Sequence, residues 1–479
     1  YILLEGLEKL GAKVDSDIPD RIKDGYGLNR HLIDRAHEDG IDTIITCDNG
    51  IAAAKEIEYG KALGMTIIVT DHHEVPYKEN EAGRRYILPP ADAVVDPRQE
   101  GCEYPFKGLC GAAVAYKLIE ALSEVNGQDV ADLDYLLENV AIATVADVMD
   151  LTEENRILVK QGLEMLTRTS NLGLRALIQC IGLEGKKIQA YHIGFILAPC
   201  LNASGKLDTA KRALALLRAK TEREADMLAG DLKALNESRR DMTDRVVDEA
   251  MAKVEQTDIR EDKVLVIYLP DCHESLAGLV AGRVRENYYR PVFVLTDSED
   301  GVKGSGRSIE SYSMYEELTG CGDLLTKFGG HPMAAGLSLD KENVEKFKRR
   351  LNDQCTLSEE ELTEKVVIDM ELPFTAITEH FIEELECLEP FGKGNAKPVF
   401  AARGVIMQHV KIIGKNKNVA KATAIDASGN RMEAICFRDA QEFAEQCERN
   451  NGKMSITFYP GINEFRGERQ IQIVITHYR

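Results

Sequence analysis

The stretch DTIITCDNGIAAAKEIEYGKALGMTIIVTDHH, residues 42–73, decides the fold class. Two apolar runs, 42–50 and 65–73, have the composition of buried strands, and a helical segment that stops at a glycine, 51–64, lies between them. Such a β-α-β unit requires two parallel strands joined by a right-handed crossover. A further strand is expected at 91–97, so the sequence predicts a doubly wound α/β domain with a parallel sheet.

Polar residues stand at the ends of both apolar runs. Asp48 ends the first, and Asp71, His72 and His73 end the second. Functional groups gather at the carboxyl ends of parallel strands, and carboxylate and imidazole groups suit Mn²⁺, Mg²⁺ or Zn²⁺. The alternative, that Asp48 and Asp71 only cap the helices that follow them, stays open.

Three further stretches carry candidate residues. Asp147 ends the apolar helical run in ATVADVMDL (143–151), where a carboxylate is costly unless it is paired or binds a metal. It can also be a simple helix terminus or ion-pair partner. Two glycine-rich loops are expected at GSGRS (304–308) and FGGHPMAAG (328–336). A glycine loop beside a cation can cradle phosphate, although by itself the first loop is better explained as a plain turn.

Length and charge limit the organisation of the chain. A chain of 479 residues exceeds one typical core, so two or three domains are expected. The net charge is -21, but residues 391–479 hold 14 lysines and arginines against 8 acidic residues, a local charge of +6. The rest of the chain therefore carries about -27. An acidic body with a basic module fits metal-binding carboxylates plus a polyanion-binding module, or simply solubility.

Cysteine usage and hydropathy point to the cytoplasm. The 11 cysteines include no C-x-x-C pair, which argues against a disulfide framework or a zinc ribbon. We find no apolar run near 18 residues and no signal peptide, so no membrane span is expected. The chain starts at Tyr1 with what reads as an amphipathic helix leading into a strand, and we expect that an upstream segment is missing.

The composition and hydrophobic pattern of the sequence change at three places along the chain. A charged helical stretch without proline, 206–257, has the pattern of a solvent-washed connector helix, and a second α/β unit follows it. From about 391, short alternating strands with one helical piece fit a small Greek-key barrel such as the OB-fold. The expected division is a first α/β domain (1–204), a connector helix (205–258), a second, smaller α/β domain (259–370) and a barrel with its lead-in (371–479).

Together these motifs resemble the DHH phosphoesterase superfamily and, within it, the RecJ family of bacterial single-strand-specific 5′→3′ DNA exonucleases. The resemblance covers nearly the whole chain and is carried by CDNG (47–50), TDHHEVP (70–76), ATVADVMDL (143–151), LNASGKLD (201–208), GSGRS (304–308), GGHPMAAG (329–336) and LEPFGKGNAKPVF (388–400). It implies a hydrolase of DNA repair and recombination that uses two Mn²⁺ or Mg²⁺ ions.

The resemblance also implies residue roles. Asp48 would bridge the metals, His72 and Asp147 would complete the ligand set, His73 would contact the phosphate, and Asp71 would support the ligands or join them. Two metals about 4 Å apart can activate water and stabilise the leaving oxygen. The residues implied to hold phosphate and the end of the substrate are Lys206, Ser305, Arg307, Gly329, Gly330 and His331.

The barrel would bind single-stranded DNA through charge and stacking. Its candidates are Lys411, Lys415, Lys417 and Arg466, with Phe465 as a stacking residue, and each can equally be a plain solvated side chain. Selectivity for a single strand would come from a narrow passage between the two α/β domains. The resemblance further implies a monomer whose partners are a single-strand-binding protein and a RecQ-type helicase.

The chain departs from the family pattern at two places. The Asp-rich cluster of the first strand is absent, and its only lookalike, Asp15-Ser16-Asp17, is better explained as structural. We therefore expect weaker Mn²⁺ binding than in a chain that carries the upstream segment. The second departure is Lys206, which stands where the pattern has arginine and lacks its two-pronged phosphate geometry.

Two other functions compete with the exonuclease. The first is a DHH enzyme for small substrates: a pyrophosphatase, an oligoribonuclease or a cyclic-dinucleotide phosphodiesterase. The barrel argues against it, because small substrates need no such module. The second is a non-catalytic DNA-binding scaffold, against which the retained Asp48, His72, His73, Asp147 and His331 argue.

Overall fold

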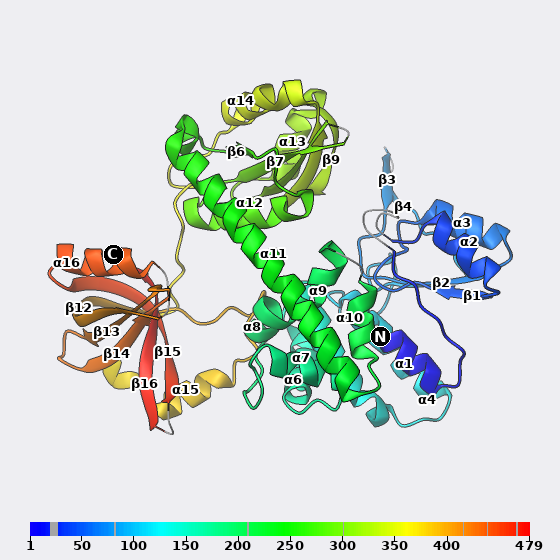
Figure 1. The fold of residues 1–479 in the computed structure, drawn as a ribbon, viewed down its shortest axis with the longest axis horizontal. Helices are drawn as coiled ribbons and strands as arrows, with labels where there is room; N and C mark the ends of the chain where they lie inside the picture. Colours follow the sequence, from blue (N-terminus) through cyan, green and yellow to red (C-terminus); the bar gives the residue numbers. More distant parts are fainter. Residues whose placement is uncertain are drawn as a thin grey trace. The chain divides into compact units, whose positions relative to one another are not determined.

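The computed structural model describes residues 1–19, 27–80, 83–207, 210–299, 301–414, 416–437, 439–465 and 468–479. The chain forms two compact units. The first consists of Tyr1–Gly205, Ala210–Gly230 and Val367–Arg479, and the second consists mainly of Asp231–Val366. Figure 1 labels their helices and strands along the chain.

The first unit begins with a region that alternates helices and strands. Its elements are α1 (Ile2–Lys9), α2 (Arg30–Glu38), β1 (Thr43–Ile45), α3 (Ala54–Ala62), β2 (Thr66–Thr70), β3 (Tyr77–Asn80), β4 (Gly83–Tyr86), β5 (Ala93–Val95), α4 (Gly111–Val125), α5 (Leu137–Ala146), α6 (Glu153–Leu166), α7 (Leu172–Cys180), α8 (Ala190–His192), α9 (Ala198–Leu207) and α10 (Lys211–Leu217).

The parallel sheet of this region has the order β1-β2-β5. On one face, Ile67 and Val69 of β2 pack with Ile33 of α2 and Ile57 of α3. On the other, Val95 of β5 packs against the core around α4. Helices therefore cover both faces, which confirms the doubly wound α/β class.

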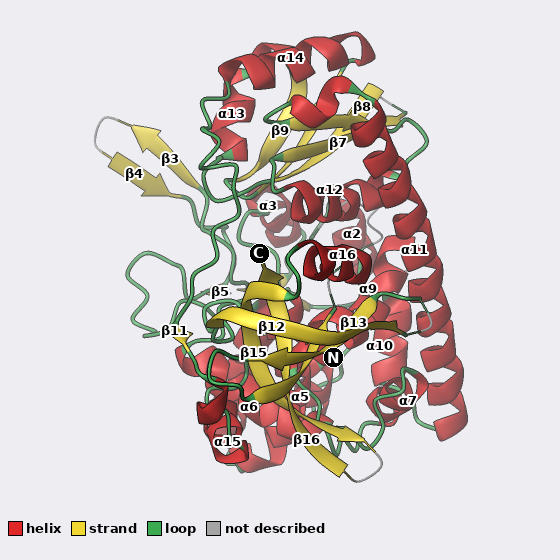
Figure 2. Ribbon diagram, turned by 90° about the vertical axis from the view of Figure 1, so that its left-hand side faces the viewer, coloured by secondary structure: helices red, strands yellow, loops and turns green. Residues whose placement is uncertain are grey.

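Two local features differ from expectation. The strand expected after α1 is not present, because the described residues 10–19 are turn and irregular chain. A hairpin that the sequence did not suggest, β3–β4, follows the Asp-His-His element, and its strands pair only with each other in Figure 2. Tyr77 and Tyr86 face each other across it with ring centroids 5.9 Å apart.

The C-terminal part of the first unit is a closed barrel. Its elements are β11 (Met370–Glu371), α15 (Glu379–Glu386), β12 (Phe400–Ile413), β13 (Val419–Ile425), β14 (Arg431–Cys436), α16 (Ala440–Arg449), β15 (Lys453–Phe465) and β16 (Glu468–Tyr478). The strands run in the order β12-β13-β14-β16-β15, and pairing of β12 with β15 closes the barrel. The parallel β14–β16 pair and the helix α16 ahead of β15 confirm the OB-fold expectation.

The second unit is a smaller α/β body. Its elements are the second part of α11 (Glu222–Gln256), β6 (Leu265–Tyr268), α12 (Glu274–Tyr288), β7 (Val292–Ser298), β8 (Gly301–Arg307), α13 (Met314–Gly320), β9 (Leu325–His331), β10 (Ala334–Leu339) and α14 (Val344–Gln354). The sheet order is β6-β7-β8-β10-β9, and of these pairs β6–β7 is parallel and the others are antiparallel.

The helix α11 differs from the solvent-washed connector expected at 205–258. From Asp231 onward it belongs to the second unit. Val247, Ala250 and Val254 are buried there against Leu265 and Ile267 of β6. The high charge of this stretch hid its apolar stripe, so the division of the chain falls inside the helix and not at its ends.

The two expected glycine-rich loops are strands. Gly304 and Gly306 belong to β8, and Gly329 and Gly330 belong to β9. A Cβ atom at Gly306 would lie 2.4 Å from the Met314 sulfur and 2.7 Å from the Phe293 ring. The glycines are needed for close packing of the strand and not for a turn, which is why composition alone suggested loops.

Candidate active site

Asp48 follows β1 in a conformation that few residues adopt. Its backbone N–H donates to the Thr70 carbonyl at 3.1 Å, which continues the β1–β2 pairing, and its φ is 64°. Positive φ is rare outside glycine and is often kept at functional sites. The side chain packs on the first turn of α4, where a Cβ at Gly111 would lie 2.5 Å from the Asp48 Oδ1. Gly111 therefore makes room for this carboxylate.

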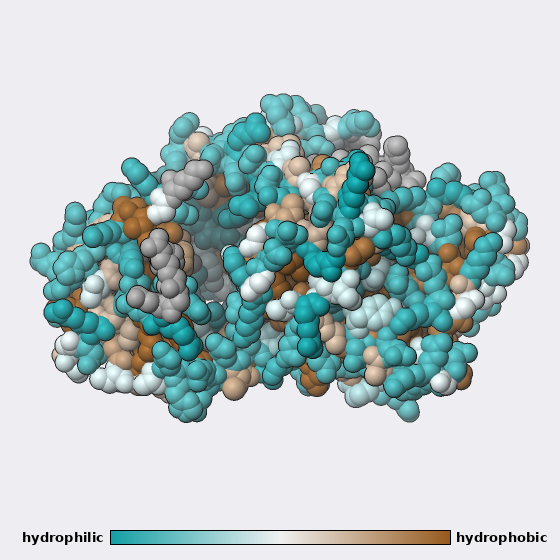
Figure 3. All heavy atoms as spheres, turned by 60° about the horizontal axis from the view of Figure 1, so that its bottom comes forward, coloured by the Kyte–Doolittle hydropathy of each residue, from teal (hydrophilic) through white to brown (hydrophobic). Residues whose placement is uncertain are grey.

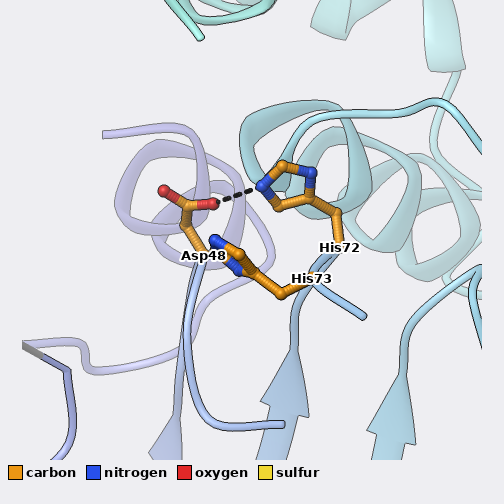
Figure 4. Close-up of side chains that lie close together, drawn as sticks. All are labelled: Asp48, His72 and His73. Carbon is orange, nitrogen blue, oxygen red and sulfur yellow. Dashed lines mark ion pairs between the residues drawn. The ribbon is translucent and has the colours of Figure 1, made fainter. Parts of the chain in front are cut away.

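His72 is the buried centre of the cluster. Its Nε2 lies 2.9 Å from the Asp48 Oδ1 and 3.5 Å from the Asp147 Oδ2, and its side chain is 8% exposed. Figure 4 shows Asp48 and His72 pointing toward each other, with His73 beside them. Ligand atoms of Asp48, His72 and His73 all lie within 4.8 Å of one another. Two carboxylates and one imidazole nitrogen thus converge on one point.

Asp71 is turned away from that point. It is 1% exposed, and its carboxylate accepts the backbone N–H groups of Ile51 at 3.0 Å and His72 at 2.8 Å. The His73 Nδ1 lies 2.7 Å from the same carboxylate. Burial alone would raise the pKa of Asp71, but these hydrogen bonds outweigh burial and lower it. Asp71 therefore orients the strand end and the His73 ring.

His73 is half-exposed and carries a proton readily. Its hydrogen bond with Asp71 raises the pKa of the imidazole despite the opposing effect of burial, and Asp48 and Asp147 act in the same direction as Asp71. Since Nδ1 faces Asp71, the other ring nitrogen is available to an anion.

Asp147 is the C-cap residue of α5, and its side chain is 51% exposed. Val148, directly after it, has a φ of 55°, which turns the chain sharply out of the helix. Burial of the carboxylate raises the pKa of Asp147, while His72 opposes this. The end of α5 thus places the Asp147 carboxylate at the edge of the sheet.

This donor set fits a hard divalent cation. Carboxylate oxygens and one imidazole nitrogen are ligands of Mn²⁺ and Mg²⁺ sites. The Nδ1 of His72 is buried without a hydrogen-bond partner among the described residues, so the ring is oriented by packing and by what its Nε2 contacts.

Sequence reasoning missed Asp96. It directly follows β5, the third strand of the sheet, and it is 2% exposed. Its Oδ1 accepts the Arg98 backbone N–H at 2.8 Å, and its Oδ2 has no hydrogen-bond partner in the described chain. Burial raises the pKa of Asp96, with Asp71 and His72 among its electrostatic neighbours. The signal was available, because the same strand-end argument that selected Asp48 and Asp71 applies to Asp96.

The lookalike Asp15-Ser16-Asp17 lies outside this cluster. Asp17 forms ion pairs with Arg35 and, at 2.7 Å, with Lys211, so it ties α2 to α10. This agrees with its structural interpretation.

One exposed face of the sheet of the second unit, called the trough below, is made mainly of small residues. Across the sheet, Arg307 of β8 faces Ala334 of β10, which faces His331 of β9, and Ser305 faces Gly336, which faces Gly329. Paired residues share one face of a sheet, so the side chains of Ser305, Arg307 and His331 surround a floor of glycine and alanine. His331, Gly336 and Gly329 are exposed, so this floor is open to solvent.

Arg307 is a half-buried cation at one side of the trough. Burial lowers the pKa of Arg307, and the positive charge of Arg285 lowers it further. No described carboxylate forms an ion pair with Arg307. Helix α12 passes close above it, since a Cβ at Gly278 would lie 2.8 Å from its guanidinium. Gly278, which the sequence reading missed, therefore leaves space for the guanidinium. An unneutralised arginine beside an open floor is suited to binding phosphate.

Several expected residues lie outside what the structure describes. These are Lys415, Arg466 and the side chains of Lys206 and Phe465. On the barrel, Lys411 is exposed and pairs across β12–β13 with Lys421, which pairs with Ile435 of β14. Lys417 lies in the turn between β12 and β13 with a φ of 52°. Phe437, at the end of β14, is 61% exposed and was not predicted as a stacking residue.

Family models match three parts of the chain. The DHH family N-terminal domain matches residues 1–144, the DHHA1 domain matches 261–357, and the RecJ OB domain matches 368–477. The single-stranded-DNA-specific exonuclease RecJ of Salmonella typhimurium is 33% identical over 98% of this chain and 83% of that protein. The chain belongs to the RecJ family.

Other members of the RecJ family agree. The exonuclease RecJ of Bacillus subtilis is 38% identical over 99% of this chain, and the chain spans 58% of that relative's length. The crystal structure of Thermus thermophilus RecJ in complex with Mn²⁺ superposes with a TM-score of 0.80 at 28% identity, covering 100% of this chain and 66% of that one. A RecJ structure bound to manganese superposes with a TM-score of 0.60 at 35% identity, over 74% of this chain and 85% of that one.

The structure has no helix, among the residues it describes, that is long and apolar enough to cross a membrane. The face drawn in Figure 3 is mainly hydrophilic with small separate apolar areas, as is ordinary for a protein surface.

Proposed function

We propose that this chain hydrolyses phosphodiester bonds of single-stranded DNA from the 5′ end, with Mn²⁺ or Mg²⁺ as cofactor, in DNA repair and recombination. The observation that carries the proposal is the convergence of Asp48 and Asp147 on the buried His72 Nε2, at 2.9 and 3.5 Å. Arg307 at the side of the trough and the basic barrel add the positive charge that binding of a long polyanion requires.

In this proposal Asp48, His72 and Asp147 hold the metal. A divalent ion bound there lowers the pKa of water and stabilises charge on phosphate oxygens. His73, whose pKa is raised by its hydrogen bond with Asp71, donates a hydrogen bond from its outward nitrogen to a phosphate oxygen. Asp71 holds this ring in place and takes no part in metal binding.

The second unit and the barrel act on other parts of the strand. Arg307 and Ser305, with the exposed Gly329 and Gly330 and with His331, hold a terminal phosphate over the trough. Lys411 and Lys417 attract the backbone, and Phe437 offers a stacking surface.

The test compares substrates. With Mn²⁺, a long single strand should be hydrolysed faster than pyrophosphate, a dinucleotide or a cyclic dinucleotide, and duplex DNA should be cut slowly. An Asp48→Asn variant should lose the activity on all of them. Faster turnover of a small substrate would favour the rival small-molecule phosphoesterase, and DNA binding without any hydrolysis would favour the scaffold.

We also propose, on the family resemblance, a cytoplasmic monomer that works with a single-strand-binding protein and a RecQ-type helicase. All cysteines of the chain are free thiols in the structure, which fits a reducing compartment. Light scattering of the purified chain tests the monomer, and pull-down with each purified partner tests the contacts.

A further inference from the structure

The turn formed by residues 391–395, just ahead of the barrel, lies against the loop that carries Asp147. The Leu151 backbone N–H donates to the Lys393 carbonyl at 2.7 Å. The Lys393 Nζ lies 3.3 Å from the Asp150 Oδ1. A segment far along the chain therefore contacts the loop that carries one candidate metal ligand.

Two glycines allow the turn to fit this closely. A Cβ at Gly392 would lie 2.6 Å from the Leu151 Cδ1. Gly394 has a φ of 73°, and a Cβ there would lie 3.0 Å from the Asp150 Cβ. Leu151 is 2% exposed, so it is covered on all sides. The contact is packed as tightly as a core and is not a loose touch between surfaces.

The turn is also braced within itself. The Asn395 side-chain amide donates to the carbonyls of Leu388 at 2.8 Å and Pro390 at 2.9 Å. The backbones of Gly392 and Asn395 bond each other in both directions, at 2.9 and 3.2 Å. These bonds fix the Lys393 carbonyl in the direction of Leu151.

Both neighbours of the turn hold it. On the side of α6, the Arg156 guanidinium donates to the carbonyls of Cys387 at 2.9 Å and Glu389 at 3.2 Å. On the barrel side, Phe391 packs edge-on to Tyr459 of β15, and the Lys397 ammonium lies 4.1 Å from the Tyr459 ring centre. The turn is therefore a rigid link between the barrel and the Asp147 loop.

We propose that the 391–395 turn is a positioning element of the metal centre: it holds residues 147–151 so that the Asp147 carboxylate stays within reach of a metal shared with His72 and Asp48. This inference rests on the metal centre of the proposed function. It predicts that the lead-in to the barrel sets metal affinity, and that metal binding in turn stabilises the contact of the turn.

The physical reason is the exposure of Asp147 itself. Its carboxylate is half-exposed, it lies just beyond the end of α5, and the chain turns at once through the left-handed Val148. On its own side the loop is tied to the end of α5 by the N–H groups of Asp147, Val148 and Met149, which donate to the carbonyls of Ala143, Val145 and Thr144 at 2.9, 3.1 and 3.1 Å. Beyond Met149, Asn155 donates to the Asp150 carbonyl at 3.0 Å, and Leu151 donates to Lys393 of the turn. Groups that orient a ligand in this way commonly change metal affinity about 10–100-fold when removed.

The first experiment loosens the turn without adding an atom. Asn395→Ala removes the two amide bonds, and we expect the chain to bind Mn²⁺ about tenfold more weakly in calorimetry. The matched control is Asn430→Ala, since Asn430 also braces a turn of the barrel, by donating to Asp426 at 3.1 Å. It should leave Mn²⁺ affinity unchanged.

Binding of single-stranded DNA in EDTA separates positioning from damage to the barrel. Both variants should bind DNA as the parent chain does, because neither changes the exposed face of β12–β14. Weakened DNA binding of Asn395→Ala, or an Mn²⁺ affinity equal to that of Asn430→Ala, would overturn the proposal.

A second measurement needs no variant. Because linkage is reciprocal, saturation with Mn²⁺ should slow deuterium exchange of the Leu151 amide, which donates to Lys393. The amides of the β13–β14 turn should not respond. Unchanged exchange at Leu151 under saturating Mn²⁺ would contradict the inference while leaving the metal centre intact. Absence of Mn²⁺ binding by the parent chain would overturn the metal centre and this inference with it.

Discussion

Asp48 and Val148, with φ values of 64° and 55°, have backbones that non-glycine residues avoid, and they lie in the two loops that bring carboxylates to His72. Each such residue costs on the order of 1–3 kcal/mol, which the surrounding structure must offset. Gly111 removes a separate steric conflict, because a Cβ there would lie 2.5 Å from the Asp48 Oδ1. The site therefore depends on backbone geometry at single residues as much as on the identity of its ligands.

Arg307 gives a prediction at the same scale. Its guanidinium is half-buried without an acidic partner in the described chain, so a bound phosphate would be its main counterion. Arg307→Ala should lower kcat/KM on single-stranded DNA by an amount equivalent to roughly 2–4 kcal/mol of transition-state stabilisation. Arg307→Lys should recover only part of this loss, because a point charge cannot reproduce a two-pronged contact. Steady-state kinetics with Mn²⁺ measure this.

The control for Arg307 is Arg283→Ala. Arg283 is an exposed arginine of α12, so its removal changes the net charge equally without touching the trough. Equal losses in the two variants would mean that the effect is long-range charge and not a local phosphate contact.

Glu138 predicts a pH dependence of stability. It is 3% exposed in α5, and burial raises its pKa from 4.5 to about 7, against the hydrogen bond of Thr169. The unfolded chain ionises this carboxyl from pH 4.5, whereas the folded chain keeps it neutral up to about pH 7. Stability is therefore lost as pH rises through this window, by about 3 kcal/mol, and is level above it.

Glu138→Gln removes the titration. In chemical unfolding at pH 4.5, 6 and 7.5, the free energy of unfolding of the variant relative to the parent chain should increase as pH rises. Glu164→Gln, at an exposed position of α6, should keep a constant difference from the parent. A constant difference for Glu138→Gln as well would mean that Glu138 is already ionised in the folded chain at acidic pH.

At the level of elements, the strands β8, β9 and β10 show how glycine can mislead. Gly304, Gly306 and Gly330 lower strand propensity, yet each lies where a Cβ would meet a neighbour at less than 3.0 Å. Composition alone does not show how closely the neighbouring strands and α13 pack against these glycines, because that distance is set by the folded sheet. The glycine motifs were located by sequence, while their secondary structure was wrong.

Gly306→Ala should destabilise the second unit by roughly 1–3 kcal/mol, the usual cost of overpacking a core. The added methyl would meet the Met314 sulfur and the Phe293 ring. Gly329→Ala, in β9, is the matched control for strand propensity, because no described atom lies within 4 Å of the position that its methyl group would take. Equal unfolding midpoints for the two variants would mean that β8 has room to relax.

Strand ends were the most predictable part of the molecule. Hydrophobic runs located β1, β2 and β5, and the general rule for parallel sheets placed Asp48 and Asp71 at one edge. The rule does not tell which way a side chain turns. Asp71 faces the backbone of Ile51 and the His73 ring, and Asp96 is buried. These orientations depend on hydrogen bonds that form only in the folded chain, so the sequence does not predict them.

At the level of the whole molecule, charge is divided between modules. The chain carries -21 in total, but residues 391–479 carry +6. Binding of a polyanion therefore depends on local cations on the barrel, and the acidic remainder opposes non-specific contacts elsewhere. Lys421 is already neutralised by Glu433 at 2.8 Å, which leaves Lys411 as the more available partner for phosphate on that strand pair.

Lys411→Gln should reduce the salt dependence of DNA binding. Loss of one phosphate contact lowers the slope of log affinity against log salt by about 0.7 for a single strand. Titrations in EDTA at several salt concentrations measure the slope. Lys160→Gln, at an exposed position of α6, should leave it unchanged, and an equal change in both variants would argue against a specific contact at Lys411.

The first unit is interrupted by the second: residues 231–366 lie in sequence between the α/β region and the barrel of one compact body. A ribosome therefore releases the whole second unit before it has made the barrel. The bond between Leu151 and Lys393 can close only after the whole second unit has been synthesised. If the 391–395 turn sets the geometry of Asp147, a chain that stops before this turn would carry an incompletely positioned metal centre even where its α/β regions fold.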